Sequence, residues 1–359
     1  MSNINPKAVV PALASVTGKV PPGALHINVD EERKPRAFRS VVVRAPARLH
    51  LGFLDPSGSG GRKFGSIGLA IDAPKTKLTV SMASSFSAQG PESDRALLAA
   101  HRFGAAFAPD LKFCVEVERA IPPHAGLGSG TQMALAVGAG ILKLAGQHLS
   151  GADLGALAER GARSGVGIAA FEQGGFVVDA GKPVDPVRAH LPPPVVMRAP
   201  CPEAWRCILI LDDQAQGVHG EQETAAFAKL PPFKEAFADH ICRLVLMKLA
   251  PALHEADIAS FGSALTEIQE IVGAHFAAAQ GGSAWSSPAA GRLAAKLKEV
   301  GAVGIGQSSW GPTGFAFVES EDAAKRLYHS FVGDAKADGL KLLIVKGRNT
   351  CASIESVFS

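Results

Sequence analysis

The stretch "PPHAGLGSGTQMALAVG", residues 122–138, combines closely spaced glycines with hydroxyl side chains at the start of an apolar run. Gly126, Gly128 and Gly130 occupy alternate positions, and a backbone without Cβ atoms lets several N–H groups converge on one anion. Ser129 and Thr131 add hydroxyl donors, and the expected helix presents its positive end to them. The loop predicts a phosphate or diphosphate site; the alternative is a glycine-rich turn that only allows close helix packing.

Two familiar nucleotide-binding patterns do not apply to this chain. The Walker pattern G-x-x-x-x-G-K-[ST] occurs nowhere in the sequence, so the loop is not a P-loop. The stretch "GVGIAA", residues 165–170, imitates a dinucleotide fingerprint, but it follows an expected helix instead of a strand, which excludes a Rossmann site. The residues that we expect to bind substrate or phosphate in the loop are His124, Gly126, Leu127, Gly128, Ser129, Gly130, Thr131 and Gln132.

A second group of polar residues lies upstream in "APARLHLGFLDPSGSGGRK", residues 45–63. Alternate residues of a strand share one face, so Arg48 and His50 are predicted to point away from the core and toward a site. Arg62 and Lys63 follow on a flexible loop that is typical of an anion clamp, although a solvated basic loop tip would look the same. Asp55 is predicted either to orient Arg62 or to coordinate Mg²⁺.

The elements that must position these residues alternate between strands and helices in both halves of the chain. This pattern predicts an α+β protein of two domains. Seven prolines between residues 182 and 202 mark the expected boundary, which gives domains 39–190 and 203–359. Residues 1–38 have several prolines and no clear period, and they predict an N-terminal extension of uncertain order.

Composition excludes several classes of protein. A formal net charge of +3 over 359 residues is too small for a nucleic-acid or membrane-surface protein, and suits small anionic substrates. The five cysteines include no C-x-x-C pair, so we expect reduced thiols, neither a zinc site nor a disulfide framework. No secretory signal and no apolar run of membrane-spanning length is evident, which favours a cytoplasmic location.

Four segments resemble a known family. They are "RLHLGFLDPSGSGGRKFGSIGLAI", "HAGLGSGTQMALAVG", "RSGVGIAAFEQGGFVVDAG" and "GIGQSSWGPTGFAF". The loop and the upstream strand resemble the GHMP superfamily of small-molecule kinases, and the four segments together resemble the beta-ribofuranosylaminobenzene 5'-phosphate synthases within it. This resemblance implies a ribosomal protein S5 domain 2-like N-terminal domain and a ferredoxin-like C-terminal domain.

The resemblance also implies a reaction. In it, 4-aminobenzoate condenses with phosphoribosyl pyrophosphate to form a C-riboside for tetrahydromethanopterin biosynthesis, and pyrophosphate and CO₂ are released. Mg²⁺ and a homodimer are expected, and no organic cofactor is. An ATP-dependent GHMP kinase is the alternative, which would require a bare final glycine motif and an acceptor hydroxyl. Arg62 is expected to contact phosphate, so that Arg62→Ala should damage the use of phosphoribosyl pyrophosphate.

The same resemblance adds candidate residues. Trp310, in "GQSSWGPTG", is expected either to form a wall for the aromatic substrate or to pack in the core. Ser308 and Ser309 precede it and are expected to bind substrate. Possible metal ligands are Ser129, Glu172, His219 and Glu221, with no feature to decide between them. The residues expected to act in catalysis are Arg48, His50, Asp55, Arg62 and Trp310.

Overall fold

The computed structural model describes residues 28–29, 38–161, 163–187, 192–215, 217 and 230–358. Its strands are β1 (Asn28–Val29), β2 (Phe38–Asp55), β3 (Arg62–Ala83), β4 (Ser87–Gln89), β5 (Lys112–Arg119), β6 (Gln147–His148), β7 (Phe176–Asp179), β8 (Lys182–Pro183), β9 (Val195–Ala199), β10 (Arg206–Asp212), β11 (Val303–Gln307), β12 (Gly314–Val318), β13 (Leu340–Val345) and β14 (Ser353–Phe358). Its helices are α2 (Ser93–Phe107), α3 (Ser129–Leu144), α4 (Gly151–Leu157), α5 (Val166–Glu172), α7 (Glu235–Leu244), α8 (Ala250–Glu255), α9 (Ile258–Phe276), α10 (Pro288–Glu299) and α11 (Glu321–Ala337), with a π-helical turn at Val245–Leu249 and a 3₁₀ turn at Ala277–Ala279.

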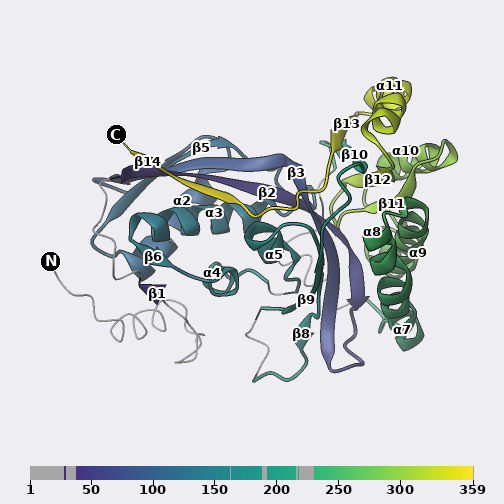
Figure 1. The fold of residues 1–359 in the computed structure, drawn as a ribbon, viewed down its shortest axis with the longest axis horizontal. Helices are drawn as coiled ribbons and strands as arrows, with labels where there is room; N and C mark the ends of the chain where they lie inside the picture. Colours follow the sequence, from purple (N-terminus) through teal and green to yellow (C-terminus); the bar gives the residue numbers. More distant parts are fainter. Residues whose placement is uncertain are drawn as a thin grey trace.

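The antiparallel hairpin of β2 and β3 extends through both halves of the molecule (Figure 1). Apolar residues alternate along β2, as a strand with one face in a core requires. Val41 and Val43 are fully buried in one hydrophobic core, whereas Leu49 and Leu51 are fully buried in another. Because β2 passes from one core to the next, its middle residues lie where the two domains meet.

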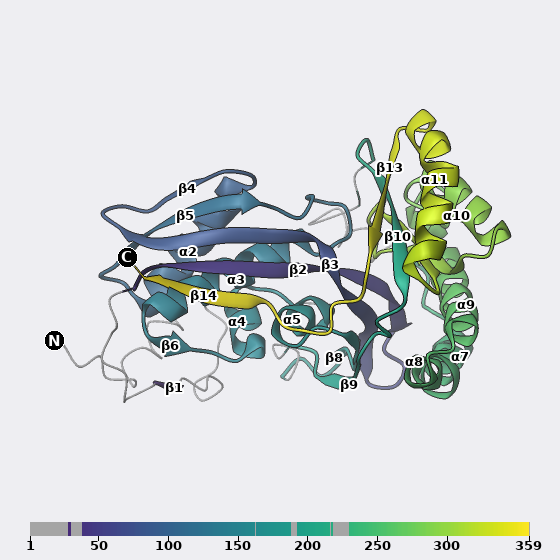
Figure 2. The same cartoon turned by 45° about the horizontal axis from the view of Figure 1, so that its top comes forward.

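The N-terminal domain is a sheet with helices on one face (Figure 2). The strand order is β14–β2–β3–β5–β4, with β7 paired to β3, and α2 and α3 pack on the sheet. Every residue from Gln132 to Leu142 in α3 is buried. A helix that is apolar on all sides needs partners on all sides, and α3 has them in the sheet, α2, α4 and α5.

The C-terminal domain is a four-stranded antiparallel sheet in the order β11–β12–β10–β13. A helical segment that runs from α7 to α10 separates β10 from β11, and α11 separates β12 from β13. This is the split βαβ arrangement of ferredoxin-like domains. Ile208 and Ile210 of β10 pack with α10 and α11, whereas Cys207 and Leu209 share a core with α9. The predicted α+β architecture of two domains is confirmed.

The two sheets divide the chain less simply than the predicted domain limits of 39–190 and 203–359 do. Strand β9, which lies between those limits, pairs with β7 of the N-terminal sheet. Strand β14, at the end of the chain, pairs with β2 of the same sheet. Of the predicted N-terminal extension, residues 1–38, the structure describes only β1 and the first residue of β2. No described helix combines the length and the hydropathy that a membrane crossing needs.

Candidate functional site

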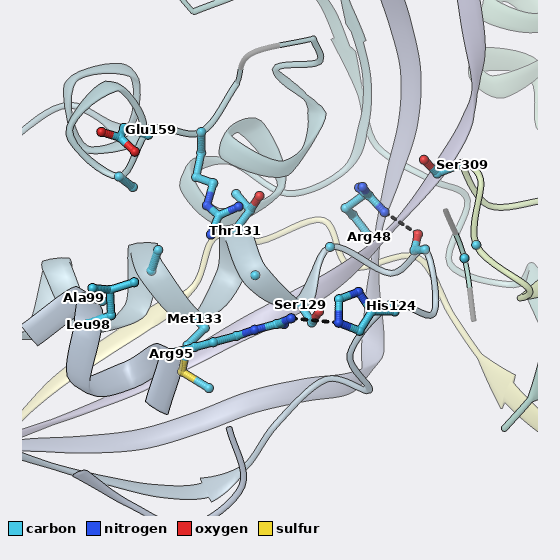
Figure 3. A pocket seen from close by; sticks show the side chains of 18 of the residues that line it. Arg48, Arg95, Leu98, Ala99, His124, Ser129, Thr131, Met133, Glu159 and Ser309 are labelled. Carbon is cyan, nitrogen blue, oxygen red and sulfur yellow. Dashed lines mark hydrogen bonds between the residues drawn. The ribbon is translucent and has the colours of Figure 1, made fainter. Parts of the chain in front are cut away.

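A cavity of about 600 Å³ opens between α2, the start of α3 and the loop before β12 (Figure 3). Figure 3 shows Arg48 and Ser309 on one side of it, Ser129 and Thr131 in the middle, and Glu159 with Ala99 on the other side. The cavity is lined by Arg48, Arg95, Leu98, Ala99, Arg102, Phe103, His124, Gly126, Gly128, Ser129, Gly130, Thr131, Met133, Ala134, Ala158, Glu159, Arg160, Gly217, Ser309, Trp310 and Gly311. We call it the anion pocket.

The glycine loop forms the floor of the anion pocket. Gly126 and Gly128 have φ angles of 78° and 84°, a left-handed conformation that favours glycine. A Cβ atom on Gly126 would lie 2.2 Å from the Ser308 carbonyl oxygen, so the loop approaches its neighbour as closely as backbone allows. Gly128 is the N-cap of α3. The first N–H groups of a helix have no partner within the helix, and no side chain caps them here.

Arg48 engages two carbonyl groups of this loop. Its Nη1 donates to the Gly126 carbonyl and its backbone N–H donates to the Leu127 carbonyl at 3.1 Å. Ser308 supports the same turn, because its hydroxyl donates to the Gly126 carbonyl at 2.7 Å and accepts from the His50 N–H at 3.0 Å. Since the acceptors of the loop are engaged, the pocket floor presents donors, which suits an anion.

Three arginines that the sequence analysis did not single out also line the anion pocket. Two of them, Arg95 and Arg102, lie seven residues apart on α2. Leu98 lies between them, and these two arginines and the leucine occupy one face of the helix. Arg95 contacts His124 Nε2 at 2.9 Å and Glu92 at 3.1 Å, and Arg102 pairs with Glu159 at 3.1 Å. The sequence signal for these two residues is the seven-residue spacing in "SDRALLAAHRF", which places both arginines on one helix face.

Arg160 is the least compensated of these cations. A Cβ atom on Gly130 would lie 3.4 Å from its guanidinium, so it stands at the first turn of α3. Partial burial lowers the pKa of Arg160, the charges of Arg95 and Arg102 lower it further, and Glu159 opposes them. Among the described residues, none accepts a hydrogen bond from this guanidinium. The pocket therefore holds more positive charge than its own carboxylate balances.

A second, smaller cavity of about 20 Å³ adjoins the anion pocket, since Ser309 and Trp310 line both. Trp310 is 4% exposed, and its ring packs edge-on against Phe276 with 4.9 Å between the ring centroids. Trp310 therefore belongs to the core and also forms a wall of both cavities. His50 lines this cavity and is 3% exposed. Burial, and secondly the charge of Arg48, lower the pKa of His50 to about 3, so its ring is neutral.

Two residues predicted in the glycine loop face away from the anion pocket. Leu127 is 1% exposed and belongs to the hydrophobic core. Gln132 is fully buried and donates to the Gly167 carbonyl at 2.7 Å, which ties α3 to α5. Leu127 precedes α3, and Gln132 begins the stretch of α3 whose residues are all buried, so both side chains lie on the protein side of the loop.

The predicted anion clamp at the tip of the β2–β3 hairpin lies outside the lining of the anion pocket. Arg62 donates to the carbonyls of Ala180 and Gly181 at 2.8 and 2.7 Å, and Lys63 is exposed. Asp55 accepts four hydrogen bonds from residues 57–59 of its own loop. Burial would raise the pKa of Asp55, but these bonds lower it overall. These three residues shape the hairpin tip.

Of the four predicted metal ligands, the structure describes Ser129 and Glu172, and it does not bring these two together. Glu172 is exposed at the end of α5 and accepts from the Gly151 N–H at 2.9 Å, at the start of α4. Ser129 lines the anion pocket. His219 and Glu221 lie outside the described residues. Within the part of the chain that the structure describes, no three His, Cys, Asp or Glu side chains could together hold a metal ion.

The fold resembles solved kinases and a decarboxylase. A homoserine kinase from Cytophaga hutchinsonii superposes with a TM-score of 0.64 at 17% identity, covering 90% of this chain and 99% of that one. A mevalonate diphosphate decarboxylase from Staphylococcus aureus superposes with a TM-score of 0.62 at 16% identity, covering 89% and 98%. At these identities the likeness shows the fold alone.

Sequence comparisons are more specific. Models of the N-terminal and C-terminal domains of GHMP kinases match residues 94–175 and 249–335. A beta-ribofuranosylphenol 5'-phosphate synthase from Archaeoglobus fulgidus is 32% identical over 336 residues, which are 87% of this chain and 99% of the relative. The synthase of the same name from Methanothermobacter thermautotrophicus is 30% identical over 299 residues, 78% of this chain and 89% of the relative. The chain thus belongs to the beta-ribofuranosylphenol 5'-phosphate synthase family, enzymes built from GHMP kinase domains.

Proposed function

We propose that this enzyme joins phosphoribosyl pyrophosphate to a para-substituted benzoate, with loss of pyrophosphate and CO₂, to give a C-riboside 5'-phosphate. The observation that carries the proposal is the anion pocket, which offers donors at two places in one cavity. The glycine loop with Arg48 provides the first, and Arg102 with Arg160 provides the second. Phosphoribosyl pyrophosphate carries a diphosphate on C1 and a phosphate on C5 of one ribose.

The diphosphate fits the glycine loop better than it fits the arginines of α2. Converging N–H groups and a helix start stabilise the charge that develops on a leaving diphosphate. Arg102 and Arg160 then bind the 5'-phosphate, because a guanidinium can donate two parallel hydrogen bonds to a phosphate group. The sequence left Arg62, Lys63 and Arg48 as possible ligands of the 5'-phosphate, and the present arrangement uses Arg102 and Arg160 in their place.

The remaining chemistry needs an electron-rich ring. A para substituent that donates electrons activates the ring carbon bearing the carboxylate, this carbon attacks C1 of the ribose, and loss of CO₂ restores the aromatic ring. The relatives are named for a phenol product, which corresponds to a hydroxyl in the para position, whereas the sequence analysis expected an amine. Both groups donate electrons, so the acceptor is either 4-hydroxybenzoate or 4-aminobenzoate.

The described residues that line the pocket do not by themselves fit a protein-bound metal ion. Glu159 is the one carboxylate among them, and Arg102 engages it. We expect Mg²⁺ to accompany the diphosphate, and we derive no step through it.

The decisive assay incubates the purified protein with phosphoribosyl pyrophosphate, Mg²⁺ and a carboxyl-labelled acceptor. Labelled CO₂ and pyrophosphate should appear in equal amounts, and parallel reactions with 4-hydroxybenzoate and 4-aminobenzoate identify the preferred ring. A reaction without phosphoribosyl pyrophosphate is the control. Absence of labelled CO₂ with both acceptors would overturn the proposal.

A GHMP-type kinase is the second candidate, and one observation favours it. Leu98, Phe103 and Met133 give the anion pocket an apolar wall beside the glycine loop, which a purine ring could contact. This candidate predicts that ATP binds in the micromolar range and competes with phosphoribosyl pyrophosphate, and that ADP forms with a small alcohol. The same protein sample, assayed for ADP instead of CO₂, distinguishes the two.

A further inference from the structure

The small cavity beside the anion pocket contains a buried nitrogen without a partner. His50 lines this cavity together with Gln269, Gln307, Phe276 and Trp310. Its Nε2 atom has no hydrogen-bond partner among the described residues. Leaving a buried polar atom unpaired costs free energy, so such an atom in a native protein points to a missing ligand or a chemical role.

The two glutamine side chains of this cavity already have partners. Gln269 donates to the Leu51 carbonyl at 2.7 Å and accepts from the Gln307 N–H at 2.9 Å. Gln307 donates to Gln280 at 2.8 Å and accepts from the Ser286 N–H at 2.7 Å. The Nε2 atom of His50, to which no described residue donates a hydrogen bond, is therefore a group that a ligand in this cavity can meet.

This nitrogen can accept a hydrogen bond. Burial and the charge of Arg48 lower the pKa of His50 to about 3, so the ring is neutral and carries one nitrogen that donates and one that accepts. In the tautomer with the proton on Nδ1, the lone pair of Nε2 requires a donor, such as a hydroxyl or an amine, and disfavours a carboxylate.

The strand places this acceptor at a useful distance from the anion pocket. Arg48 and His50 are successive residues on one face of β2, so their Cα atoms are about 7 Å apart. Arg48 reaches the glycine loop and His50 reaches the small cavity, while Ser309 and Trp310 line both spaces. An aromatic ring at this boundary can present its carboxyl end to the sugar and its para end to His50.

We propose that Nε2 of His50 binds the para substituent of the aromatic acceptor and removes its proton during the attack, which makes His50 a catalytic residue. This inference rests on the proposed function. A volume of about 20 Å³ holds one group of the size of a water molecule. The cavity thus receives the hydroxyl or amino group and excludes the ring.

The proton transfer balances without any further reactant. The bond from sugar C1 to the diphosphate breaks as the ring carbon bonds to C1, and the para O–H proton passes to Nε2 while its electron pair forms a C=O bond. The bond to CO₂ then breaks, its electron pair restores the aromatic ring, and the proton returns from Nε2 to oxygen. The O–H of the positively charged adduct is strongly acidic, so even a weakly basic imidazole can accept its proton.

The test compares His50→Phe and His50→Gln with wild type, and His254→Phe serves as control because His254 is an exposed histidine on α8. We expect His50→Phe to lower kcat with 4-hydroxybenzoate by about 100-fold or more, as loss of a general base does. The dissociation constant of pyrophosphate should not change. His50→Gln keeps an acceptor oxygen and should recover part of the activity, and His254→Phe should behave as wild type.

A binding measurement keeps this inference separate from the proposed function. Calorimetry on wild type should show 4-hydroxybenzoate binding about 10-fold or more tighter than benzoate, since a site built for a hydroxyl leaves a polar atom unpaired with the analogue. His50→Phe should lose this preference. Retention of the preference, or of wild-type kcat, overturns the role of His50 while product formation stands. Absence of product from wild type refutes the proposed function and with it the catalytic role of His50, and the binding ratio then decides only whether Nε2 of His50 binds the para substituent.

Discussion

Replacing Arg160 by alanine should separate ligand binding from stability. The guanidinium has no described acceptor in the protein, and Arg95 and Arg102 repel it. Its removal should therefore leave the free energy of unfolding of the ligand-free protein unchanged or slightly higher. A bound phosphate would lose charge-assisted hydrogen bonds worth about 1.5–3 kcal/mol. That loss corresponds to an increase of about 10- to 150-fold in the dissociation constant of phosphoribosyl pyrophosphate.

Calorimetry and inhibition by ribose 5-phosphate measure this effect. Arg326→Ala is the matched control, because it removes the same charge from an exposed position on α11. If Arg160 holds the 5'-phosphate, ribose 5-phosphate should inhibit the Arg160→Ala variant far more weakly, while Arg326→Ala should match wild type. Equal affinities in both variants would refute the assignment, and a marked loss of stability in Arg160→Ala would refute the view that the cation is uncompensated.

Three further predictions concern the loop, the buried histidine and the hairpin tip. Gly126→Ala should lower the free energy of unfolding by about 2 kcal/mol or more, because the new Cβ would lie 2.2 Å from a carbonyl oxygen. Gly146→Ala, at φ 69° and in open space, should lower it only by the backbone strain of about 1–2 kcal/mol. Denaturant unfolding of the two variants measures the difference. The folded pKa of His50, about 3, lies below its unfolded value of 6.5, so stability is present above pH 6.5 and is lost as pH falls toward 3. Between pH 7 and pH 4.5 the wild type should lose about 2.5 kcal/mol more than His50→Phe, and equal slopes would contradict the burial of a neutral ring. Arg62→Ala should lower the free energy of unfolding by about 1–3 kcal/mol, because two hydrogen bonds to backbone carbonyls are lost, and it should leave the binding of phosphoribosyl pyrophosphate unchanged. Weaker binding of phosphoribosyl pyrophosphate with unchanged stability would instead support the anion clamp predicted from the sequence.

Features that depend on neighbouring residues could be predicted from the sequence. The glycine loop lies at the start of α3 and lines the pocket, because glycine spacing and the start of a helix act over a few residues. The alternation that placed Arg48 and His50 on one face of a strand is equally local, and both residues reach the site region. The α+β pattern followed from the same periodicities, since strands and helices bury alternate or every third to fourth residue.

Features that depend on packing between distant segments could not be predicted in this way. Arg62 and Lys63 follow the site strand closely in the sequence, yet the hairpin carries them to a tip where Arg62 bonds to the backbone of residues 180–181. Arg95 and Arg102 lie on α2, whereas Arg160 follows α4 more than fifty residues later in the chain. Only the packing of α2 and α4 beside α3 gathers the three cations. The sequence by itself determined the donor-rich loop and the two-domain architecture, because backbone conformation and hydrophobic periodicity are short-range. The tertiary structure decided which cations line the pocket and which histidine nitrogen is buried in a cavity, because burial and charge clustering arise only when separate elements pack together.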